Sequence, residues 1–171
     1  MVIHRATTNL IKVFGATPAN VNNLNLDSTA TLTADGSYHN ILISWDIEND
    51  DNHLYIDDVS GITVNVSDNT DIDYSVANYA IGAHVDGTQK SNCDINVMYF
   101  NPAEKMDFSV EANRRKFFDV NGNWVPSRLD GGQEPTGNRP AIYMCATYRA
   151  FQGNHGSGGG FAVTGALTEP A

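Results

Sequence analysis

The chain has 171 residues, of which 41% are hydrophobic and 18% are charged, and these values are typical of an ordered globular protein rather than a disordered tail. Its length suits one domain over residues 1–171. The formal net charge of -10 disfavours binding to nucleic acid or to an anionic membrane surface. Because there is no long apolar run and no cationic stretch followed by one, we expect neither a membrane anchor nor signal-peptide export.

Short apolar and β-branched runs, separated by clusters of Asn, Asp, Gly and Ser, predict an all-β antiparallel sandwich. Residues 10–14 form the first such run, and residues 21–26 alternate with asparagine. A turn is predicted at residues 34–37, directly after a short run at residues 30–32. Further strands are predicted over residues 41–45, 53–56, 61–66, 79–85, 93–100, 141–148 and 161–167.

Residues 41–45 and 53–56 predict a hairpin with an acidic loop over residues 48–52. Alternation places Ile41, Ile43 and Trp45 on one face of the first strand. One face of each strand is therefore expected to be buried.

The two cysteines, Cys93 and Cys145, lie far apart in the sequence and inside predicted strands. A thiol in such a run behaves as a small apolar group, so we expect two buried free thiols. A disulfide between them is the alternative. Alternation also groups Cys93 with Ile95, Val97 and Tyr99 on one face.

One helix is predicted, beginning near Asp107 or Ser109 and ending at about Phe117. Val110 and Phe117 lie seven residues apart and would pack the helix on the sheets. The basic cluster over residues 114–116 is interpreted as a solvated face of this helix.

Catalytic patterns are incomplete, so the chain is predicted not to be an enzyme. The nearest approach to a glycosidase pair is Glu48 with Asp50, but His53 stands where a second glutamate would be needed, and the pattern falls in a turn. No Gly-x-Ser-x-Gly motif is present. The glycine-rich residues 153–160 lack the Gly-Lys-Ser/Thr ending of a phosphate loop and predict a flexible connection.

No cofactor or metal is expected, although calcium remains an alternative. The aspartates that could gather around it are Asp46, Asp50, Asp51, Asp57 and Asp58, but no Asp-x-Asp-x-Asp-Gly loop exists. The histidines lack the spacing of zinc motifs. Ordinary turn and strand-end aspartates explain the pattern more simply.

Trp124, beside the Asn-Gly turn, is the best candidate for stacking on a sugar ring. A tryptophan is nevertheless more often part of the core than a glycan platform. We therefore assign Trp124 as a weak candidate glycan contact. We assign no catalytic, cofactor-binding or metal-binding residue.

Two segments, residues 101–117 and 153–167, together resemble concanavalin A-like (laminin G-type) jelly-roll domains in structural proteins of tailed bacteriophages. Residues 39–59 are compatible with this resemblance, because the Trp-Asp strand and Leu-Tyr-Ile-Asp-Asp look like the family's hairpin, with Asp58 where glycine is usual. Members of that family bring additional opening strands. We therefore expect either a partial sandwich or an edge completed by a neighbouring chain.

The resemblance implies a non-enzymatic virion structural protein, such as a capsid decoration, collar, tail or fibre-associated subunit. Its expected partners are other virion proteins and symmetric copies of itself. The alternative is a lectin-like, carbohydrate-binding module that recognises host surface glycans. Location in a virion favours the first hypothesis, whereas saturable glycan binding favours the second.

Overall fold

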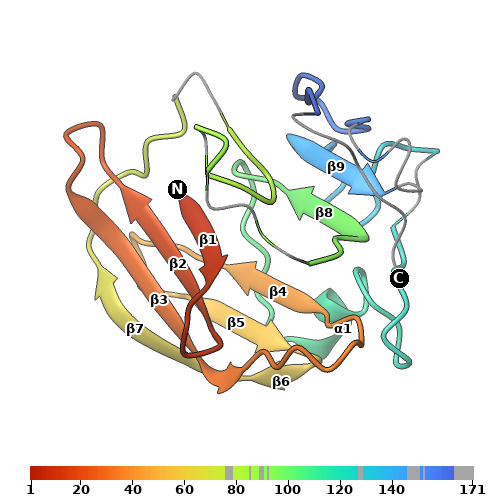
Figure 1. The fold of residues 1–171 in the computed structure, drawn as a ribbon, viewed down its shortest axis with the longest axis horizontal. Helices are drawn as coiled ribbons and strands as arrows, with labels where there is room; N and C mark the ends of the chain where they lie inside the picture. The colour runs from red at the N-terminus through yellow and green to blue at the C-terminus, as the bar shows by residue number, and fades with distance from the viewer. Residues whose placement is uncertain are drawn as a thin grey trace. The chain divides into compact units, whose positions relative to one another are not determined.

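The structure is a computed structural model that describes residues 1–75, 79–84, 86–88, 91, 93–126, 129–145, 151 and 153–163. These residues are mostly antiparallel β-sheet with one short helix, as the sequence predicts (Figure 1). The chain divides into two compact units, here called unit 1 (Met1–Ser75 with Lys105–Val125) and unit 2 (Val76–Glu104 with Pro126–Ala171).

Unit 1 contains a four-stranded antiparallel sheet with the order β1-β2-β3-β7. Inward side chains of the two central strands are fully or almost fully buried, among them Ile11, Val13, Leu24 and Leu26. On the opposite face, Lys12 pairs with Asp27 at 2.7 Å across the two strands. The strands are β1 (Val2–Arg5), β2 (Leu10–Ala16), β3 (Asn22–Thr31) and β7 (Ile62–Ser67).

A second sheet of unit 1, with the order β4-β5-β6, shares this core. Leu54 and Ile56 form a buried cluster with Ile11 of the first sheet, and Ile43 packs against it. The predicted hairpin and the inward orientation of its apolar residues are confirmed, because Ile43 and Trp45 also pack on the cluster around Val13. The strands are β4 (Ile41–Ser44), β5 (His53–Ile56) and β6 (Val59–Ser60).

Strands β5 and β6 are joined by a two-residue turn, Asp57 and Asp58, between the paired residues Ile56 and Val59. Both aspartates have positive φ, 50° and 67°. Two consecutive residues of this kind form a type I′ turn, whose twist matches that of the hairpin strands. Asp58 therefore occupies a left-handed position that glycine usually fills.

The helix α1 (Glu111–Arg114) is shorter than predicted. Asp107 accepts hydrogen bonds from the backbone N–H and the hydroxyl of Ser109, both within its own turn, so neither residue caps the helix. Phe117 is buried as predicted, with its ring centroid 5.6 Å from that of Phe108. Val110 is exposed, and its predicted packing role is wrong.

Unit 2 contains one antiparallel pair, β8 (Val97–Phe100) with β9 (Ile142–Cys145), among its described residues. Tyr143 is fully buried and donates its hydroxyl to the carbonyl of Pro126 at 2.6 Å. The rings of Tyr99 and Tyr143 pack edge to face, with centroids 6.0 Å apart. These contacts fix β9 within unit 2.

Several predicted strands differ from the structure. Residues 93–96 lie outside β8, and Cys93 and Ile95 are exposed, so their predicted burial is wrong. Cys93 is a free thiol, as expected, and Cys145 is half-buried. No strand forms over residues 79–84 or 161–163. The remaining parts of the predicted strands, residues 85, 146–148 and 164–167, lie outside the described residues.

The glycine-rich residues 153–160 run beside the start of β9 rather than forming a flexible connection. Asn154 accepts the backbone N–H of Tyr143 at 2.8 Å, and the N–H of His155 donates to the carbonyl of Tyr143 at 2.8 Å. A Cβ at Gly156 would lie 2.5 Å from the carbonyl oxygen of Pro140. Glycine is thus needed for close backbone approach.

Candidate functional site

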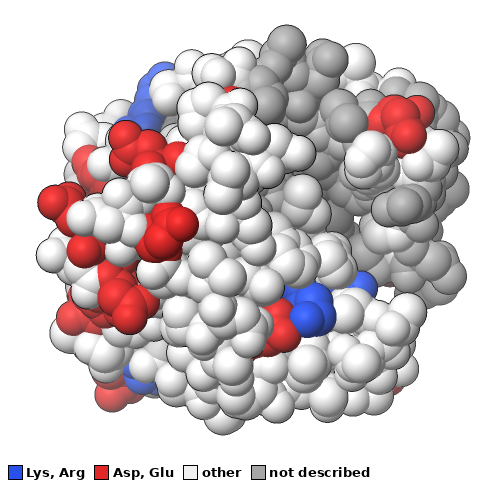
Figure 2. Space-filling view, turned by 90° about the vertical axis from the view of Figure 1, so that its left-hand side faces the viewer, with Lys and Arg blue, Asp and Glu red and all other residues white. Residues whose placement is uncertain are grey.

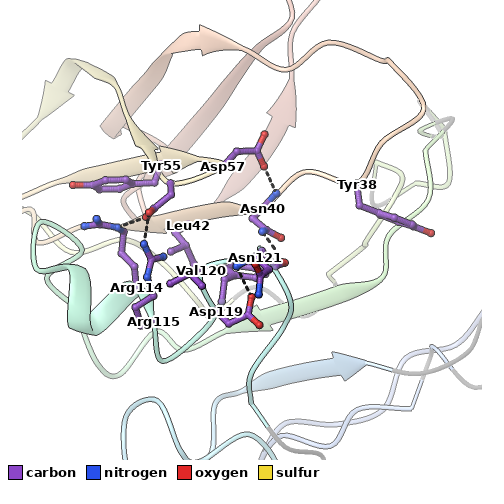
Figure 3. A pocket seen from close by; sticks show the side chains of 13 residues that line it. Tyr38, Asn40, Leu42, Tyr55, Asp57, Arg114, Arg115, Asp119, Val120 and Asn121 are labelled. Carbon is purple, nitrogen blue, oxygen red and sulfur yellow. Dashed lines mark hydrogen bonds and ion pairs between the residues drawn. The ribbon is translucent and has the colours of Figure 1, made fainter.

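A pocket of about 340 Å³ lies on unit 1, where the segment before β4, the β5–β6 turn and the chain after α1 meet (Figure 3). Its lining is mixed, with aromatic, apolar, amide and charged side chains. The lining residues are Tyr38, Asn40, Leu42, Tyr55, Asp57, Asp58, Arg114, Arg115, Phe118, Asp119, Val120, Asn121 and Gly122.

Asp58 binds two arginines at one side of the pocket. Nε of Arg114 donates to Oδ1 at 2.5 Å, and Arg115 donates to Oδ2 at 2.5 Å. These bonds hold the pKa of Asp58 below its usual value, and the bond from Arg115 is the largest cause. The interpretation of residues 114–116 as a solvated face is therefore wrong for the two arginines, because a turn distant in sequence engages both.

Arg114 makes further contacts that fix its guanidinium. It lies over the ring of Tyr55, 4.6 Å from the ring centroid, and donates to the carbonyl of Phe108 at 2.6 Å. Its side chain is only 12% exposed. A buried arginine needs such partners, because a cation removed from water without them is costly.

Asp57 connects the same turn to the segment before β4. One carboxylate oxygen lies 2.6 Å from Nδ1 of His39, and the other accepts the backbone N–H of Asn40 at 2.9 Å. The bond to Asp57 is the main cause that raises the pKa of His39, and Asp35 contributes from 3.3 Å. Below its raised pKa, His39 carries a positive charge between two carboxylates.

Asp119 closes the third wall of the pocket. It accepts the backbone N–H groups of Asn121 and Asn123 and the side-chain amide of Asn123, all within 2.9 Å. These bonds lower the pKa of Asp119, with Asn123 as the principal cause. The amide of Asn40 donates to the carbonyl of Gly122 at 3.0 Å and ties this turn to the segment before β4.

Tyr38 and Asn121 are two further polar residues of the lining. The side chain of Asn121 also contributes to the lowered pKa of Asp119. Tyr38 is 61% exposed, and Figure 3 shows it at the rim, apart from the charged groups. Sequence analysis identified the Asn-Gly turn at residues 121–122 but assigned no binding role to Asn121 or to Tyr38.

Trp124, the candidate glycan contact, lies near but does not line the pocket. It is half-buried, pairs in an isolated antiparallel bridge with Phe118, and packs its ring 5.2 Å from that of Phe118 and 6.1 Å from that of Phe117. This position matches the reading of Trp124 as part of the core. Its contact with a glycan stays a prediction.

The five aspartates considered for calcium do not gather at one place. Asp46, Asp50 and Asp51 precede β5, whereas Asp57 and Asp58 follow it, so the two groups lie at opposite ends of the strand. The described part of the chain holds no cluster of three or more His, Cys, Asp or Glu side chains arranged for a metal.

The loop with the glycosidase-like pattern contacts the segment before α1 instead. His53 lies 2.9 Å from Asp51 and 3.3 Å from Asp107, and Lys105 pairs with Asp51. Glu48 is exposed on the same loop. The carboxylates of Asp51 and Asp107 thus join the β4–β5 loop to the segment that leads to α1.

Figure 2 shows one face on which carboxylate side chains gather along one side with few lysines or arginines, in keeping with the net charge of -10. No helix among the described residues is long and apolar enough to span a membrane. Comparison of the chain with protein-family models, curated proteins and solved structures found no match. The resemblance to phage jelly-roll domains therefore stays a prediction.

Proposed function

We propose that the protein is a non-enzymatic structural component of a virion that acts through protein–protein assembly, with its sheets belonging to a concanavalin-like jelly roll. Its partners are other virion proteins, in symmetric copies. The observation that supports assembly is the pair of exposed edges on the four-stranded sheet of unit 1.

Strands β1 and β7 end this sheet, and the described residues add no further strand beyond either. Both edges carry exposed apolar side chains: Val2 is 54% exposed, Ile3 40% and Val64 41%. An edge strand presents N–H and C=O groups to any chain that can pair with them, and natural proteins usually protect such edges. We propose that neighbouring virion subunits cover the edges at β1 and β7.

The bonds made by the carboxylates of the pocket also support a binding role rather than catalysis. Asp57, Asp58 and Asp119 each accept two or more bonds from neighbouring groups. A general base or nucleophile needs a carboxylate oxygen that is available to the substrate, whereas these carboxylates are already engaged by neighbouring groups.

The test is co-purification with particles. We expect the full chain to band with purified phage particles in a density gradient and to cross-link to other virion proteins. Replacing Ile3 and Val64 with lysine should reduce incorporation, because both edges would then repel an incoming strand. The matched control is Val21→Lys, since Val21 is 56% exposed in the β2–β3 connection and outside both edges. Absence from particles would overturn the proposal.

The second candidate function is recognition of host glycans, which the mixed aromatic and amide lining of the pocket favours. A glycan array of the full chain tests it. Saturable binding that is lost in Trp124→Ala would support the sequence-based candidate, provided that circular dichroism shows the variant to be folded. Absence of binding, together with a position in the particle, would favour assembly.

A further inference from the structure

We propose that two copies of the chain pair through β1, antiparallel and about a two-fold axis, so that their four-stranded sheets join into one continuous sheet. Strand β1 lies at one edge of that sheet (Figure 1). The pairing rests on the assembly role proposed above and specifies the partner at this edge. That partner is a second copy of this chain rather than a different virion protein.

Of the two edge strands, β1 is the more regular. Its four residues pair with β2 in an unbroken register. Strand β7 contains a bulge, because Asn25 and Leu26 of β3 pair with Val66 and Val64 and leave Asn65 between them. A bulge twists an edge strand and discourages pairing with another chain. Strand β1 is therefore better suited to accept a regular strand.

The main-chain groups that β1 presents to solvent follow from its turn into β2. Ala6 donates its N–H to the carbonyl of Leu10 at 2.8 Å. Residues that bond across an antiparallel pair alternate with residues that do not, so Arg5 and Ile3 direct their N–H and C=O groups away from β2. Ile11, the partner of Arg5, accordingly donates its N–H to a side chain of β3 at 2.9 Å.

This arrangement makes the edge self-complementary. Ile3 and Arg5 lie on either side of His4, so a two-fold axis at His4 places Ile3 opposite Arg5 of the second copy. Each such pair then exchanges both of its N–H···O=C bonds, as in the bonded pairs of any antiparallel sheet. The free main-chain groups of one β1 thus satisfy those of the other.

The charges of this edge permit the approach of a second copy. The net charge of -10 makes two copies repel one another, but β1 and β2 contain no Asp or Glu. The guanidinium of Arg5 is held by its own chain, at 2.8 Å from the carbonyl of Leu32 and 2.5 Å from Oδ1 of Asn9. On the next strand, Lys12 pairs with Asp27. Charges held in this way oppose an incoming strand less than free lysines do.

Pairing would also bury apolar surface that β1 exposes. All four residues of β1 are exposed, and Val2 and Ile3 are 54% and 40% exposed. His4 stacks on Phe14 of β2, with ring centroids 5.6 Å apart, so the two stacks would meet on one face of the joined sheet. Because the paired strands are short, we expect a weak dimer whose population depends on concentration.

Sedimentation equilibrium of the full chain over a concentration series tests the pairing. We expect a monomer–dimer equilibrium. Ile3→Pro should raise its dissociation constant about ten-fold, because proline removes an N–H that bonds the second copy and none that bonds β2. The matched control is Thr7→Pro, since Thr7 is the second residue of the turn after β1, where proline is favoured. Its dissociation constant should equal that of the parent chain.

A cross-link tests the register. In the proposed dimer His4 faces His4 of the second copy as a non-bonded pair, whose Cα atoms lie about 4.5 Å apart, within reach of a disulfide. His4→Cys should therefore form an intermolecular disulfide under mild oxidation, identified by mass spectrometry of its peptides. Cys93→Ser is the background for this variant, because Cys93 is an exposed free thiol. Val64→Cys, on the bulged edge, is the control and should stay monomeric.

The proposal is overturned if the chain stays monomeric throughout the series or if His4→Cys forms no cross-link. It is also overturned if the dimer persists undiminished in an Ile3→Pro variant that circular dichroism shows to be folded. Should Ile3→Pro unfold, the cross-link at His4→Cys decides. A monomeric chain that still bands with particles would leave the assembly role intact, whereas a dimer that is absent from particles would contradict that role and not the pairing.

Discussion

Nε of Arg114 lies 2.5 Å from Oδ1 of Asp58, which joins the only described helix to the β5–β6 turn. The two residues lie 56 positions apart in the sequence. Asp58 has two roles in this contact, because it supplies the carboxylate and also adopts a left-handed backbone conformation with φ of 67°. Substitution can separate these roles.

Replacing Asp58 with alanine should lower the free energy of unfolding by about 2 kcal/mol. The lost bonds involve charged groups, but Asp58 is partly exposed, so the ionic contribution is discounted. Asp58→Gly removes the same bonds yet relieves the left-handed strain, so it should be more stable than Asp58→Ala by about 1 kcal/mol. Urea unfolding measures the free energy of unfolding of both variants. Equal stability of Asp58→Ala and Asp58→Gly would contradict the argument that the left-handed backbone at this position is strained.

We expect the protonation of His39 to contribute to the pH dependence of the free energy of unfolding. Because Asp57 raises the pKa of His39 above its unfolded value, the folded state holds its proton more tightly. The stabilisation is complete below about pH 6.5 and is lost as the pH rises through the raised pKa of His39. His39→Gln should flatten this alkaline decline in unfolding curves. A variant that kept the same decline would show that another group causes it.

The sequence predicts the local elements of unit 1 well and the pocket poorly. The β4–β5 hairpin follows from the apolar positions Ile41, Ile43 and Trp45 on one face, a pattern that requires only neighbouring residues. Strand β1 was not predicted, because its four residues are all exposed and carry no alternating pattern. The pocket depends on contacts such as Asn40 with Gly122, 82 residues apart, which no local pattern encodes.

A side chain at Gly15 would crowd the core of unit 1. A Cβ there would lie 2.7 Å from Cδ1 of Ile72 and 3.1 Å from Cβ of Leu24. Gly15→Ala should therefore destabilise the chain by about 1–3 kcal/mol through overpacking, measured by urea unfolding. Gly159→Ala is the control, since a Cβ at Gly159 meets nothing within 4 Å. An unchanged midpoint for Gly15→Ala would show that Ile72 can move aside.

Removing the hydroxyl of Tyr143 tests the core of unit 2. Tyr143→Phe leaves the carbonyl of Pro126 without the 2.6 Å bond that it accepts, in a buried site. The free energy of unfolding should fall by about 1–3 kcal/mol, the cost of an unsatisfied buried acceptor. Amide hydrogen exchange should rise in β8 and β9. Unchanged exchange there would contradict the role assigned to this bond.

The interleaving of the two units along the chain bears on the order of folding during synthesis. Residues 76–104, which belong to unit 2, leave the ribosome before residues 105–125 complete unit 1. Hairpins such as β4–β5 close over short loops and can form early, whereas Arg114 of α1 and Arg115 after it must return to Asp58 across a long one. A nascent chain that has not reached α1 carries Asp58 without the two arginines that bind it.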